Sequence, residues 1–254
     1  MKSTTIIQGR RAVLALALLS ACAVPMAGQR NGNIRSTFFV TIKADRLGDF
    51  QAAVKENMAV LKKANWDKGS TVWRSLTGPN EFRLTQFSQK WAELDITQDP
   101  KLKEVSADLT RIGARINQCV EKGERVITEV LPDLSVPRTA DPPKMIRVMR
   151  SLVRADKVND YLALVKSDVV PAVKKGQLKV FSVARTRYGA PVSEIVTVTG
   201  LQSWADLDGT SPLVEGMGGR EKYDAFLAKV TPMIIRTQVD VYRYQPELSY
   251  TPVK

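Results

Sequence analysis

The segment Ala44-Asp-Arg-Leu-Gly-Asp-Phe-Gln-Ala-Ala-Val-Lys55 occurs a second time, with conservative changes, as Ala155-Asp-Lys-Val-Asn-Asp-Tyr-Leu-Ala-Leu-Val-Lys166. In both copies the apolar residues follow helical spacing, and acidic residues stand where a helix begins. Asp45 and Asp156 are therefore predicted N-caps, an interpretation preferred over paired catalytic carboxylates. A repeated segment of this kind predicts a fold built from two similar units.

Two further pairs of segments match in the same order and at nearly constant spacing. Trp91-Ala-Glu-Leu-Asp95 matches Trp204-Ala-Asp-Leu-Asp208, and Pro132-Asp-Leu-Ser135 matches Pro246-Glu-Leu-Ser249. Between them, alternating β-branched and aromatic residues predict strands, and Gly-Pro turns predict hairpins. Each unit is therefore predicted to have the order β-α-β-β-α-β, the ferredoxin-like plan.

The predicted strands and helices follow from these periodicities. The strands are expected over 37–43, 70–76, 81–88, 124–130, 145–153, 178–185, 193–199 and 237–244, with helices from 45 and 156 and over 102–120 and 220–230. Pro171 is predicted to kink or end the helix that starts near 156. The domain boundaries that follow are an export signal over 1–28, a polar tether over 29–35, a first unit over 36–135, a Pro-rich linker over 136–144 and a second unit over 145–250.

The first 28 residues have the pattern of an export signal: basic residues, an apolar run over 12–19, then small residues. Leu19-Ser-Ala-Cys22 resembles a bacterial lipoprotein box, which makes Cys22 the lipidation candidate. Ordinary cleavage near Ala23 or Ala27 is the competing interpretation. Both predict an exported protein, in the periplasm or outside the cell, whose one expected membrane contact is a lipid anchor at Cys22.

The composition narrows the classes of function. The chain has 254 residues, 44% of them hydrophobic, and a net charge of +12. This charge would permit polyanion binding, which predicts a steep salt dependence. No dense basic block with interleaved aromatic residues occurs, so specific nucleic-acid binding is not expected.

The chain contains no histidine, which excludes Ser-His-Asp catalysis, His-ligated haem and the usual zinc and non-haem iron sites. Outside the leader the one cysteine is Cys119, which lies on the apolar face of the helix predicted over 102–120 and is expected in the core. We therefore predict no cofactor and no metal site.

The layout of strand, helix, hairpin, Trp-containing turn, helix and strand resembles the dimeric α/β-barrel superfamily. Its members include antibiotic-biosynthesis-monooxygenase-like, EthD-like and NIPSNAP-type proteins. Over residues 36–249, the resemblance implies an α+β fold of two tandem ferredoxin-like βαββαβ units, with antiparallel sheets packed as an intramolecular α/β barrel. It also implies active cavities between the sheet and the helices of each half. Members include cofactor-free oxygenases, haem proteins that use a histidine ligand and proteins of no known activity.

Candidate ligand-binding residues are polar or aromatic groups that interrupt apolar strands or follow them. They are Arg185, Arg187, Tyr188 and Trp204 in the second unit, and Trp73, Arg74 and Trp91 in the first. Arginine beside an aromatic ring suits a carboxylate or a planar acidic ligand. The alternative is that these arginines face solvent and these tryptophans fill the core.

The function expected from these features is a non-catalytic binding or interaction domain for a small acidic or aromatic molecule. No convergent set of catalytic residues is visible, and this favours binding over catalysis. The alternative is a cofactor-free monooxygenase-like or isomerase-like enzyme of the superfamily. A buried polar cavity lined by Arg185 or Trp73 would favour a ligand binder or an enzyme over a structural role.

Overall fold

The computed structural model of the chain describes residues 33–66, 69–94, 100–136, 142–176 and 178–252. The export signal predicted over 1–28, with Cys22, lies outside the described residues, as does most of the Pro-rich linker. The first unit contains β1 (Ile34–Ile42), α1 (Leu47–Lys63), β2 (Thr71–Ser75), β3 (Glu81–Ser88), α2 (Pro100–Lys103), α3 (Ser106–Cys119) and β4 (Val120–Val130). The second contains β5 (Met145–Val153), α4 (Val158–Leu164), α5 (Val170–Lys175), β6 (Phe181–Tyr188), β7 (Glu194–Leu201), α6 (Pro212–Met217), α7 (Arg220–Val230) and β8 (Ile234–Tyr244).

The strands form one closed barrel in the order β1-β3-β2-β8-β5-β7-β6-β4. All pairs are antiparallel, and two of them join the units. At one seam Trp73 on β2 pairs with Tyr244 on β8, and at the other Glu129 on β4 pairs with Arg185 on β6. The predicted fold class is therefore confirmed: two ferredoxin-like units share one intramolecular α/β barrel.

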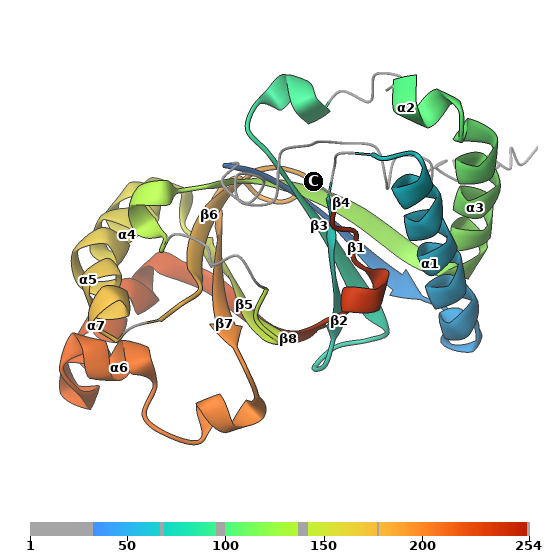
Figure 1. Cartoon of the computed structure of the whole chain (residues 1–254). Coiled ribbons are helices and arrows are strands. Elements are labelled where there is room, and N and C mark those ends of the chain that lie inside the picture. The colour runs from blue at the N-terminus through green and yellow to red at the C-terminus, as the bar shows by residue number, and fades with distance from the viewer. Residues whose placement is uncertain (1–32, 67–68, 95–99, 137–141, 177, 253–254) are drawn as a thin grey trace, which may run out of the picture.

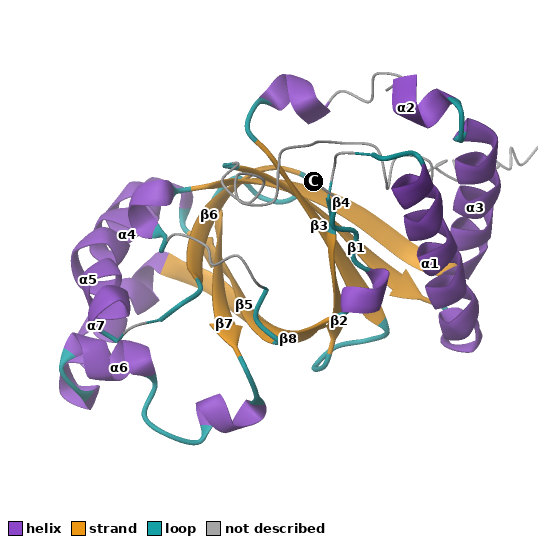
Figure 2. Cartoon of the chain, in the orientation of Figure 1, coloured by secondary structure: helices purple, strands orange, loops and turns teal. Residues whose placement is uncertain are grey.

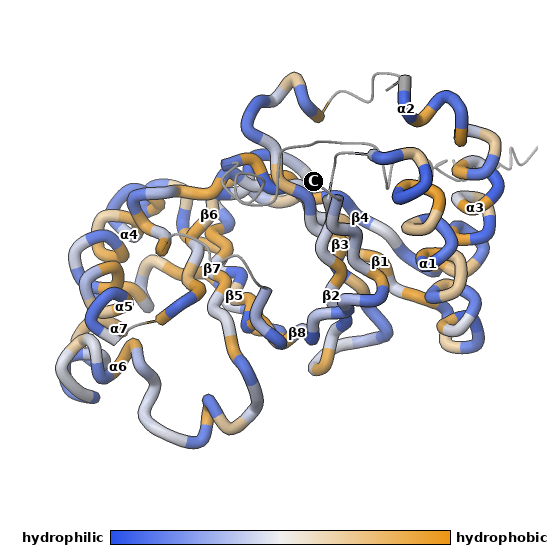
Figure 3. The backbone as a smooth tube through the Cα atoms, in the orientation of Figure 1, coloured by the Kyte–Doolittle hydropathy of each residue, from blue (hydrophilic) through white to orange (hydrophobic). Residues whose placement is uncertain are grey.

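The helices lie outside the barrel, on two opposite sides. Figure 1 shows α1 and α3 against one side, and α4, α5 and α7 against the other; Figure 2 shows the strands between these two helical layers. Successive strand residues point in turn to the helices and to the barrel interior. Figure 3 shows hydrophobic and hydrophilic residues interspersed along the strands. Each helical layer covers its own core, which includes Phe38, Phe50 and Phe82 in the first unit and Val153, Tyr161 and Ile195 in the second.

The predicted N-caps at Asp45 and Asp156 are wrong. A 3-10 turn over Ala44–Arg46 precedes α1, and no side-chain hydrogen bond caps the helix. Asp49, in the first turn, instead accepts a hydrogen bond from Arg46 at 3.0 Å. In the second unit Lys157 and Asp160 repeat this pair at 3.0 Å. The recurring aspartates thus form exposed ion pairs across the helix start, which add little stability.

Two helices differ from the predicted ones. The helix expected over 102–120 is split into α2 and α3, and β4 begins at Val120. Between α4 and α5 the backbone makes one wide, π-helical turn over Val165–Val169. Pro171 follows directly, near the start of α5, and has no N–H to donate to the preceding turn. The helix is therefore disturbed before the proline and continues beyond it. No helix among the described residues is long and apolar enough to span a bilayer.

Candidate functional site

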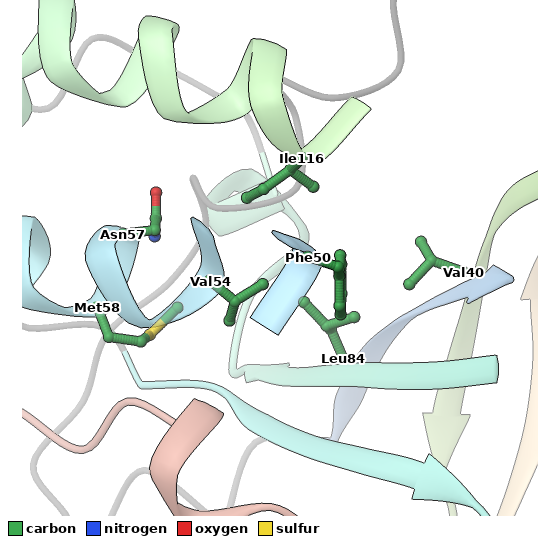
Figure 4. A pocket seen from close by; sticks show the side chains of 7 residues that line it. All are labelled: Val40, Phe50, Val54, Asn57, Met58, Leu84 and Ile116. Atoms are coloured by element: carbon green, nitrogen blue, oxygen red, sulfur yellow. The ribbon is translucent and has the colours of Figure 1, made fainter. Parts of the chain in front are cut away.

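A small apolar cavity lies between α1, α3 and the first unit's sheet (Figure 4). It has room for about one water molecule. The helical spacing on α1 and the strand alternation on β1 and β3 bring side chains from four elements to this point. The lining residues are Val40 on β1, Phe50, Val54, Asn57 and Met58 on α1, Leu84 on β3 and Ile116 on α3.

Asn57 is the one polar residue of this lining, and its side chain is fully buried. Neither Nδ2 nor Oδ1 has a hydrogen-bond partner among the described residues. Leaving a buried polar group unpaired costs about 1–3 kcal/mol, so such groups are rare in native interiors. The amide can donate two hydrogen bonds and accept others, but it cannot take up a proton. Asn57 can therefore hold and orient a polar atom in the cavity.

A second polar cluster lies inside the barrel, around Arg83 on β3. Arg83 pairs in register with Phe39 on β1 and with Trp73 on β2, so all three side chains share the inner face. Its guanidinium carbon lies 5.8 Å from the centre of the Phe39 ring and 5.9 Å from that of Tyr242. Burial lowers the pKa of Arg83 to about 10, so the side chain stays a cation at neutral pH.

The cluster also contains three charged residues that surround this group: Arg150, Glu194 and Glu81. Arg150 Nε donates to Glu194 Oε1 at 3.1 Å, and the Arg150 guanidinium lies 5.4 Å from the Phe39 ring centre. Tyr242 donates its hydroxyl to Glu81 Oε1 at 2.7 Å. Burial raises the pKa of Glu81 and, more strongly, that of Tyr242. The barrel interior therefore holds two guanidinium groups around one aromatic ring, with carboxylates at their edges.

Of the predicted site residues, Trp73 is the one that belongs to this interior cluster. It is 6% exposed and packs against Tyr244 at 5.1 Å between ring centres. Its Nε1 donates to Thr71 Oγ1 at 3.2 Å. Arg74, the next residue, points to the opposite face of the sheet, where it lies over the Phe82 ring.

The other predicted site residues lie at the surface and do not meet Trp73. Arg185 donates from Nε to the Val192 carbonyl at 3.3 Å. Arg187 forms an ion pair with Glu129, with its Nε 2.7 Å from the carboxylate. Tyr188 and Trp91 contact each other edge to face at 5.7 Å between ring centres, and both are exposed, as is Trp204. Arg187 and Tyr188 contact Glu129 and Trp91 of the first unit at the barrel's edge. The ligand role of all these residues stays a prediction.

Sequence reasoning missed Asn57, Arg83 and Arg150. In Glu81-Phe-Arg-Leu-Thr-Gln-Phe-Ser88, alternation places Arg83 opposite the apolar residues, which in an open sheet would face water. The barrel closes over that face. The signal that could have found Arg83 was the predicted barrel itself, because a polar residue in the middle of the inner face of a closed barrel is buried.

No protein-family model and no curated protein sequence matches this chain. Solved structures do. A protein from Lactobacillus acidophilus NCFM, assigned as a monooxygenase, has a TM-score of 0.59 at 10% identity, over 86% of this chain and 96% of that one. One from Fusobacterium nucleatum, also assigned as a monooxygenase, has a TM-score of 0.56 at 9% identity, over 83% and 91%. An anthrone oxidase-like protein has a TM-score of 0.52 at 11% identity, over 85% and 93%.

This chain has the dimeric α/β-barrel fold. The predicted resemblance to that superfamily is confirmed for the fold, with both halves in one chain. At these identities the likeness extends to the fold alone, so the dimeric α/β barrel does not by itself fix an activity. The cavity at Asn57 nevertheless lies between sheet and helices, the place that the resemblance implies for an active cavity.

Proposed function

We propose that this protein is a cofactor-independent, oxygenase-like enzyme that acts on a small, mainly apolar molecule at the Asn57 cavity. The observation that carries the proposal is the fully buried Asn57 amide, which has no partner among the described residues and borders an apolar cavity. Proteins of the same fold that are assigned as monooxygenases support it. A substrate oxygen bound to Nδ2 would remove the cost of the unpaired amide.

The cavity suits dioxygen better than it suits a polar reactant. Six of its seven lining side chains are apolar, and its room for about one water molecule is also enough for a diatomic gas. A larger substrate needs more space. Met58, at 8% the most exposed of the seven, has the flexible thioether side chain best able to move aside.

The chemistry balances without a cofactor. A substrate with an acidic CH₂ beside a carbonyl loses one proton to water, and the resulting carbanion gives its electron pair to O₂. The peroxide takes up a proton and loses water, which leaves a ketone: CH₂ plus O₂ gives C=O plus H₂O. Asn57 would stabilise the negative enolate oxygen by donating from Nδ2. Since no lining side chain titrates, the substrate must itself be acidic enough to ionise in water.

The test is oxygen uptake by the purified protein with anthrone as the probe substrate. Asn57→Leu removes the amide but keeps the number and branching of the side-chain heavy atoms. It should lower the rate by 10²-fold or more, a typical loss for one donor to an oxyanion, which is about 2.7 kcal/mol. Asn117→Leu, the same change at an exposed position on α3, should leave the rate unchanged. Equal rates for Asn57→Leu and the unsubstituted protein would refute the assignment of the site.

A second candidate function is non-catalytic binding of the same class of molecule. The observation that favours it is that none of the seven lining residues can act as a base. Binding would show as a rise in melting temperature with anthrone that is lost in Asn57→Leu, while oxygen uptake stays at the rate of the uncatalysed reaction. Oxygen uptake above the rate of the uncatalysed reaction would support the enzymatic function over simple binding.

A further inference from the structure

Arg83 is buried in the barrel interior without acceptors for part of its guanidinium group. The residue is 3% exposed, and its Nε and NH1 atoms have no hydrogen-bond partner among the described residues. Arginine carries five N–H donors and cannot shed its charge at neutral pH, so it is normally buried only with acceptors. The unpaired donors therefore need an explanation that this chain's own described side chains do not supply.

The carboxylates nearby are already engaged by other groups. Glu81 accepts from Tyr242, and Glu194 accepts from Arg150. Glu124 lies 4.0 Å from the Arg150 guanidinium. Arg150 shares the Phe39 ring with Arg83, and this second cation works against the charge on the first. Among the described residues, Arg83 itself therefore has no ion-pair partner, and two of its donor atoms stay free.

We propose that the barrel interior binds a small monocarboxylate, held by the Nε or the NH1 donor of Arg83. Nε and NH1 donate from different edges of the guanidinium, so a carboxylate oxygen can accept from either nitrogen. A hydrogen bond between two charged groups is roughly twice as strong as a neutral one. Phe39, Trp73 and Tyr242 surround the guanidinium and would contact the apolar part of the ligand. The site is separate from the Asn57 cavity and does not depend on the function proposed there.

The exposure of neighbouring residues indicates the end of the barrel from which the ligand would arrive. Glu124 pairs in register with Phe39 and is 42% exposed, and Arg150 is 19% exposed. Arg83 lies deeper than both. The positive charge of Arg150 would attract an anion to this end. The carboxylates at the edge of the cluster oppose this attraction, and they repel a dianion more strongly than a monoanion.

The direct test is an NMR titration of the unsubstituted protein with acetate, and then with propionate, at constant ionic strength. The measured quantity is the chemical shift of the Arg83 Nε–H. A saturable shift of this resonance is expected, and a second titration with chloride serves as the comparison. A resonance unmoved by carboxylates would overturn the proposal. A shift with chloride alone would overturn the assignment of a carboxylate.

The matched variants are Arg83→Lys and Arg74→Lys, adjacent cross-strand positions on opposite faces of the sheet. Arg83→Lys keeps the charge but loses the Nε and NH1 donors, and should weaken acetate binding about 10- to 100-fold, as measured by the change in tryptophan fluorescence on titration. Arg74→Lys should leave the affinity unchanged. Equal affinity in both variants would contradict the site. If Arg83→Lys does not fold, a crystal of the unsubstituted protein soaked in bromoacetate decides: bromine density beside Arg83 supports the site, and water alone overturns it.

Discussion

Arg150 on β5 and Glu194 on β7 form an ion pair inside the barrel, with 3.1 Å between Nε and Oε1. The Glu194 side chain is 3% exposed, and it is one of two carboxylates near the same guanidinium. Removing one member of a buried pair leaves the other charge uncompensated. We expect Glu194→Gln to lower the free energy of unfolding by about 3 kcal/mol, measured by urea denaturation. Glu124→Gln, at 4.0 Å and 42% exposed, should cost less than about 1 kcal/mol; similar losses in both variants would contradict this account.

Asn57→Leu should raise stability by about 1–2 kcal/mol, because it removes a buried amide that has no partner among the described residues and places apolar atoms against an apolar cavity. The measurement is the melting temperature, with Asn117→Leu as the exposed control expected to stay within about 0.5 kcal/mol. A loss of stability in Asn57→Leu would indicate that the amide is bonded in solution, for example to a trapped water.

Glu81→Gln should gain stability relative to the unsubstituted protein as the pH rises from about 4 towards neutral. Burial raises the pKa of Glu81, so the folded state favours the protonated carboxyl. The stability that Glu81 contributes is therefore present below its ordinary pKa and is lost as the pH passes through the raised value. Glutamine cannot ionise, and its oxygen can still accept from Tyr242. Urea unfolding at several pH values tests this; a difference between the two proteins that is independent of pH would contradict it.

Gly189→Ala should destabilise the protein by about 2 kcal/mol or more. Gly189 has φ of +82°, and a β-carbon there would lie 2.0 Å from the Arg125 carbonyl oxygen on β4. The substitution therefore strains the turn and pushes the β6–β7 hairpin away from the first unit. Gly78→Ala, in the equivalent hairpin, meets only the Ser75 side chain and has no positive φ, so it should be close to neutral. Chemical denaturation of both variants gives the comparison.

Much of the fold could be predicted because local sequence patterns determine the order and type of its elements. The repeated segments at Ala44 and Ala155 and the matched turns at Trp91 and Trp204 give the element order, and the strand alternation gives the helix-facing core. The helix starts were predicted less well, because an aspartate suits both a capping position and an ion pair with a neighbouring basic residue.

The site was harder to predict, for a physical reason. Arg83 and Arg185 have the same local pattern, a basic residue within an alternating strand. Arg83 points into the barrel and is buried, whereas Arg185 points outward and bonds to the Val192 carbonyl. Which face becomes interior depends on pairing between strands far apart in sequence, across the seams. Trp73 was identified because a large aromatic residue on a strand is notable in any context.

The pairing of β2 with β8 and of β4 with β6 has a consequence for the chain as a single polypeptide. Expressed alone, either half would present two bare edges, each with a row of unsatisfied backbone groups ready to accept a foreign strand. Two fragments produced by a cut within 136–144 should thus find each other and reassemble, whereas one fragment by itself should aggregate or form a symmetric pair. The covalent link keeps one copy of each half in every molecule. The two halves can therefore diverge in sequence without forming barrels from two identical halves.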